Sequence, residues 1–170
     1  MTGLHAGTAL GAVAVALVLQ VSVLSHLAWF GVAPDLCLLV VVAAGLSRGP
    51  TSGMLVGFAA GLALDLVPPA DHLAGRWALA LVLAGYVAGR VRPAGNVGLP
   101  VTLGTVAVCS LVATSVFALS GLVLGDLDLG VPGLLQVVLI SVLLDVALAA
   151  LVVPWLTRLL SVGEPERVMA

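Results

Sequence analysis

Four polar side chains stand inside long apolar runs of this sequence, where their chemistry would be unusual. Asp145 lies near the middle of its run, which also contains Gln136. Asp65 lies near the end of another run, and Gln20 interrupts a third. In a membrane, a carboxylate at mid-bilayer costs about 3 kcal/mol or more unless it is paired, hydrated or protonated. Asp145 is therefore either a functional group or a protonated side chain that hydrogen-bonds a neighbouring helix, and both interpretations stay open.

Two opposite charges stand where one apolar run ends and the next begins. Asp65 lies near the end of the third run, and Arg76 opens the fourth on the same side. We expect Asp65 and Arg76 to form a structural pair that closes this side of the protein. Asp35 opens the second run, where it could share Arg76 and where a carboxylate suits the positive end of a helix dipole.

The sequence offers little for catalysis or metal binding. Its three histidines, at 5, 26 and 72, are scattered, and it contains no G-x-S-x-G, H-E-x-x-H or phosphate-loop motif. The spacing of Cys37 and Cys109 matches no metal motif, so both are expected to be buried small hydrophobes. We therefore predict no catalytic residue, no metal site, no cofactor and no enzymatic activity.

The composition defines the class of protein that must position these groups. Of 170 residues, 62% are hydrophobic and 8% are charged, with a mean hydropathy of +1.29. A soluble domain carries roughly 25% charged residues, so this chain cannot cover itself with a solvated surface. Its long apolar runs indicate a lipid bilayer as the solvent, and no basic block suggests nucleic acid as a partner.

The apolar runs and the polar breaks between them predict a single integral membrane domain over residues 1–170. We expect an all-α bundle of about six transmembrane helices, because lipid offers no partner to backbone N–H and C=O groups. The expected spans are residues 4–27, 32–47, 51–67, 75–91, 99–124 and 131–160.

The arginines predict the orientation of this bundle. If successive connections alternate sides, one side holds all the arginines but Arg76: Arg48, Arg90, Arg92, Arg158 and Arg167. The other side collects Asp35, Asp71, Asp126 and Asp128. Because positively charged connections stay in the cytoplasm, both termini are expected to be cytoplasmic.

Glycines recur every fourth residue in three of the runs. They are Gly53, Gly57 and Gly61 in the third run, Gly85 and Gly89 in the fourth, and Gly3, Gly7 and Gly11 in the first. Residues four apart share a helix face, and glycine there lets another backbone approach closely. The stripes predict either packing within the same bundle or a docking face for the span of a partner.

The order of several short motifs resembles the rod shape-determining protein MreD family. These motifs are Pro34-Asp35-Leu36, then Arg48-Gly49-Pro50, then the glycine repeat from Gly53 to Gly61 with Asp65-Leu66, then Gly85-Tyr86-x-x-Gly89-Arg90. The resemblance covers roughly residues 10–160. It implies a non-enzymatic subunit of the bacterial cell-wall elongation machinery in the cytoplasmic membrane. Its implied partners are the bitopic protein MreC and, through it, MreB, a RodA-type polymerase and a penicillin-binding transpeptidase.

Two hypotheses for the function follow. In the first, the chain is a scaffold that binds the spans of MreC and its partners through its glycine faces. The alternative rests on the similarity of the family's bundle to the substrate-binding subunits of energy-coupling-factor transporters. In that case Asp145 and the glutamines would line a pocket for a small solute.

Overall fold

The computed structural model describes residues 3–29, 31–67, 74–91, 98–125 and 130–161. Over these ranges the chain forms six α-helices and one short 3-10 helix, and its one β-type contact is an isolated bridge between Trp29 and Val32. The all-α prediction is therefore confirmed for this part of the chain. Arg92, Arg167, Asp71, Asp126 and Asp128, used in the orientation argument, lie outside the described ranges.

The helices follow the expected spans closely after residue 50. They are α1 (Gly3–Ser22), η1 (Leu24–Leu27), α2 (Leu36–Arg48), α3 (Pro50–Leu66), α4 (Arg76–Val91), α5 (Leu99–Leu124) and α6 (Val131–Ser161). Of these, α5 and α6 are long and apolar enough to cross a membrane, whereas the apolar parts of α1, α2 and α3 are shorter.

The first two expected spans differ from the structure at the segment that joins them. The helix α1 ends at Ser22 instead of residue 27, and α2 begins at Leu36 instead of residue 32. Between them Trp29 and Val32 exchange two backbone hydrogen bonds around Gly31, whose φ of 79° favours glycine. These two bonds satisfy backbone N–H and C=O groups of Trp29 and Val32 without a helix.

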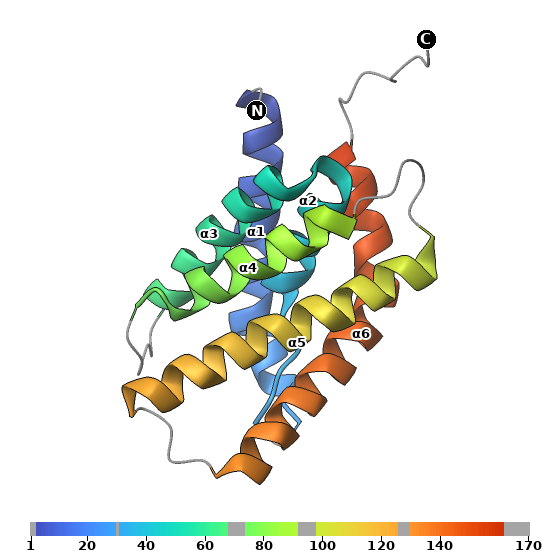
Figure 1. Ribbon diagram of the computed structural model, residues 1–170. Helices are drawn as coiled ribbons and strands as arrows, with labels where there is room; N and C mark the ends of the chain where they lie inside the picture. The colour runs from blue at the N-terminus through green and yellow to red at the C-terminus, as the bar shows by residue number, and fades with distance from the viewer. Residues whose placement is uncertain (1–2, 30, 68–73, 92–97, 126–129, 162–170) are drawn as a thin grey trace.

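The helix α2 is the centre of the bundle. All ten of its residues from Cys37 to Leu46 are buried, and it contacts each of the other five α-helices. A helix that is apolar on every side must be enclosed by protein or lipid, and here the other helices enclose it (Figure 1). It ends at Gly49, whose φ is 89°, and Pro50 starts α3 at once, as expected of proline in a first helical turn.

The helices α3 and α4 form a hairpin in which glycines replace side chains. A Cβ added to Gly53 would overlap the carbonyl oxygen of Gly85, and one added to Gly57 would overlap that of Leu81. Gly61 lies equally close to the backbone of Ala78, and Gly89 to that of Pro50. The glycine faces of these two helices therefore pack against each other within the chain.

The ends of the helices gather at opposite ends of the bundle. The start of α1, the turn between α2 and α3 and the end of α6 lie together at the top of Figure 1. The Arg48 guanidinium donates a hydrogen bond to the carbonyl of Leu160, which ties the α2–α3 turn to the last turn of α6.

The close α3–α4 contact gives the first testable expectation. Gly57→Ala should destabilise the protein by about 1–3 kcal/mol, because the new methyl meets backbone that cannot move aside cheaply. Gly104→Ala on α5 is the matched control, since a Cβ there meets nothing within 4 Å and alanine favours helix by up to about 1 kcal/mol. Thermal unfolding in detergent measures both, and equal stability of the two variants would contradict the packing described.

Candidate functional site

The most enclosed carboxyl group in the described chain lies at the N-terminus of α2. Asp145 of α6 is 1% exposed and accepts two hydrogen bonds. Its Oδ1 accepts one from the Asp35 backbone N–H at 2.7 Å, and its Oδ2 accepts one from the Ser110 hydroxyl of α5 at 2.6 Å. One carboxylate thus joins α6 to both α2 and α5.

The next amides of α2 are bound in the same way. Asp35 is the N-cap of α2, and its Oδ1 accepts from the Leu38 N–H at 3.0 Å. Gln20 of α1 accepts from the Cys37 N–H at 3.1 Å. We call Gln20, Asp35, Ser110 and Asp145 the α2 cap cluster.

The α2 cap cluster has a simple physical reason. The first amides of any helix lack partners within the helix, and an apolar interior supplies none, so each unsatisfied amide would cost several kcal/mol. Carboxylates are also the groups that the positive end of the helix dipole favours. The arrangement therefore stabilises the start of α2 with side chains drawn from three other helices.

The sequence singled out three members of the α2 cap cluster without predicting that they meet. Asp145 and Gln20 were polar groups within apolar runs, and Asp35 was expected at a helix start. Ser110 was missed, because a serine in a membrane helix can hydrogen-bond its own backbone and gives no signal. Gln136, by contrast, is exposed.

A second polar group lies where α3 ends and α4 begins. Asp65 is 2% exposed and accepts from the backbone N–H groups of Gly75 at 2.8 Å, Trp77 at 3.2 Å and Ala78 at 3.1 Å. Its carboxylate thus caps the start of α4, in the place that an N-cap side chain would take.

Arg76 binds α5 from the first turn of α4. It donates to the Phe117 carbonyl at 2.8 Å and to the Ser120 hydroxyl at 3.1 Å. Its guanidinium lies 4.1 Å from the centre of the Phe117 ring, and Trp77 stacks on the same ring. The structure brings Asp65 beside the backbone that flanks Arg76, while Asp35 lies in the α2 cap cluster. Pairing of Asp65 with Arg76 stays a prediction.

The described residues present no metal site. No group of three or more histidine, cysteine, aspartate or glutamate side chains is gathered among them. Both cysteines are buried free thiols, and Cys109 donates a weak hydrogen bond to the Ala84 carbonyl. The polar groups of both sites described above hold helices together.

These features define a class of protein: a helical bundle with long apolar helices and polar side chains turned inward to bind backbone, as in integral membrane proteins. The family model for rod shape-determining protein MreD matches residues 7–162, nearly the whole chain. The chain belongs to the MreD family, as its motifs indicated, and is a rod-shape-determining membrane protein of bacteria. No curated protein and no solved structure matched it.

Substitution of Asp145 tests the α2 cap cluster. Asp145→Leu should lower the stability by about 1–3 kcal/mol for each of the two donors left without an acceptor. Asp145→Asn should stay close to the unmodified protein, because its carbonyl oxygen accepts from Asp35 and its amide can donate to the Ser110 oxygen. Gln136→Leu, at an exposed position of the same helix, is the control. Thermal unfolding in detergent would contradict this account if Asn were as damaging as Leu.

Exchange of Asp65 and Arg76 distinguishes two roles of Asp65, an ion pair with Arg76 and a cap for the first amides of α4. A pure ion pair would tolerate the double variant Asp65→Arg with Arg76→Asp, because the opposite charges remain. We expect no rescue, since arginine has no hydrogen-bond acceptor for the amides of Gly75, Trp77 and Ala78. The level of folded protein in the membrane measures this, with Asp65→Asn as a milder control. A double variant that recovers the original level would show that the ion pair dominates.

Proposed function

We propose that the chain crosses the bacterial cytoplasmic membrane six times, with both termini in the cytoplasm. Large apolar side chains on the outside of the bundle support this, among them Leu143, Leu151 and Trp155 of α6, which are 69%, 71% and 74% exposed. Water would not tolerate such a surface, whereas lipid requires it. Arg48, Arg90 and Arg158 near the ends of α2, α4 and α6 fit a cytoplasmic side.

In this topology the second crossing is only partly helical. At 1.5 Å per residue the 13 residues of α2 span roughly 20 Å, which is less than the ~30 Å of hydrocarbon. Residues 28, 29 and 31–35 lie outside regular helix and supply part of the rest. Non-helical backbone at membrane depth requires protein partners; Asp145 provides one for the Asp35 N–H, and Trp29 and Val32 bind each other.

We further propose a non-enzymatic scaffold function in the cell-wall elongation complex, with binding to MreC and, through it, to MreB, a RodA-type polymerase and a penicillin-binding transpeptidase. The family match over residues 7–162 is the observation that carries this proposal. The polar side chains described above support it, because they bind the chain's own backbone and are not directed to a substrate. Since α3 and α4 use their glycine faces against each other, we assign partner binding to the outward apolar surface.

Purification of the full chain from native membranes tests this function. A tagged copy extracted in mild detergent should enrich MreC over a tagged, unrelated multi-pass protein expressed at the same level. Absence of MreC enrichment with a folded, correctly inserted chain would contradict the scaffold function.

A further inference from the structure

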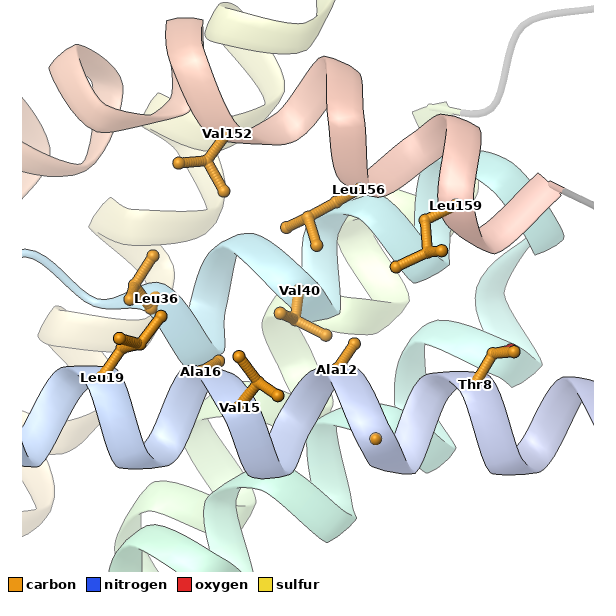
Figure 2. A pocket seen from close by; sticks show the side chains of 11 residues that line it. Thr8, Ala12, Val15, Ala16, Leu19, Leu36, Val40, Val152, Leu156 and Leu159 are labelled. Atoms are coloured by element: carbon orange, nitrogen blue, oxygen red, sulfur yellow. The ribbon is translucent and has the colours of Figure 1, made fainter.

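A groove runs between α1 and α6 with α2 as its floor, and nothing in the scaffold function requires it (Figure 2). Its volume is about 340 Å³. Side chains of α1 and α6 face each other across it, and Leu36 and Val40 of α2 lie between them. The lining residues are Thr8, Gly11, Ala12, Val15, Ala16, Leu19, Leu36, Val40, Val152, Leu156 and Leu159.

The groove has the length and chemistry of one leaflet of a bilayer. From Thr8 to Leu19 the helix rises roughly 16 Å at 1.5 Å per residue, about half of the ~30 Å hydrocarbon core. Its lining is apolar except for Thr8, which lies at one end beside Leu159 (Figure 2). Counting all the empty space between its atoms, the groove holds about 750 Å³. A helix roughly 10–12 Å across would need on the order of 1,000 Å³ or more over this length, so the groove fits a single acyl chain better than a helix.

The charges near the two ends of the groove differ in sign. At the Leu159 end, Arg158 is the preceding residue of α6, and Arg48 binds the carbonyl of the following Leu160. At the other end, Leu36 follows Asp35, which lies beside Asp145. Arginine presents five donors in a planar fork that suits phosphate, so the Leu159 end complements an anionic headgroup.

We propose that this groove binds one anionic phospholipid, with an acyl chain between α1 and α6 and the phosphate at Arg158 and Arg48. The proposal goes beyond the scaffold function. The two have only one assumption in common, which is that the chain is embedded in a bilayer. The bound chain would complete the packing of α1 and α6, between which a groove is otherwise left open.

Native mass spectrometry of the delipidated full chain tests the proposal, with dioleoyl phosphatidylglycerol and dioleoyl phosphatidylcholine as the two probes. The unmodified protein should retain one phosphatidylglycerol in preference to phosphatidylcholine. Gly11→Leu, or Ala12→Leu should the first variant not fold, should bind both lipids about tenfold more weakly because the side chain fills the groove. Ala14→Leu, at an exposed α1 position outside the groove, should bind as the unmodified protein does. Arg158→Gln should lose only the preference for phosphatidylglycerol.

Three outcomes would overturn the proposal. Equal lipid retention by Gly11→Leu and Ala14→Leu would show that the groove holds no lipid. Equal binding of the two lipids by the unmodified protein would remove the headgroup site. Gly11→Leu that keeps its lipid but no longer enriches MreC would assign the groove to a partner helix. The lipid-binding measurement uses the isolated chain. If only the scaffold function were wrong, the result of this measurement would not change.

Discussion

The structure depends on the amides that α2 presents at its start, deep among apolar helices. A helix that begins at a membrane surface leaves its first N–H groups to water, but α2 begins where the partners are side chains. Asp145, Gln20 and Asp35 accept from Asp35, Cys37 and Leu38 respectively. Because α1 and α6 contribute two of these acceptors, the need of the first α2 amides for acceptors fixes where α1 and α6 cross α2.

The remaining helices complete the enclosure by different means. The α3–α4 hairpin gains close backbone contact by omitting side chains at Gly53, Gly57 and Gly85, so its stability rests on van der Waals contact. Asp65 then holds the start of α4 within that hairpin, and Arg76 ties the same helix start to α5. The two devices leave large apolar side chains exposed on the exterior of α5 and α6.

The sequence predicted the bounds of the later helices better than those of the first two. Polar breaks separate the later apolar runs, so the bounds of α4, α5 and α6 were within one residue of those expected. The second expected span began four residues before α2, although Asp35 was already expected at a helix start and is the N-cap of α2. Asp145 could be singled out by its depth, but its contact with Asp35 joins residues 110 positions apart. A buried carboxylate needs hydrogen-bond donors, and the start of a buried helix needs acceptors. Only this complementarity could have suggested that Asp145 meets the start of α2.

Hydrogen exchange of the α2 amides, measured by NMR in lipid nanodiscs, tests most directly whether side chains cap a helix start within the bundle. The account predicts slow exchange of the Asp35, Cys37 and Leu38 amides, and a selective increase at Asp35 when Asp145 is replaced by leucine. Rapid exchange of these three amides in the unmodified protein would contradict it, because they would then be bound to water instead of to Asp145, Gln20 and Asp35.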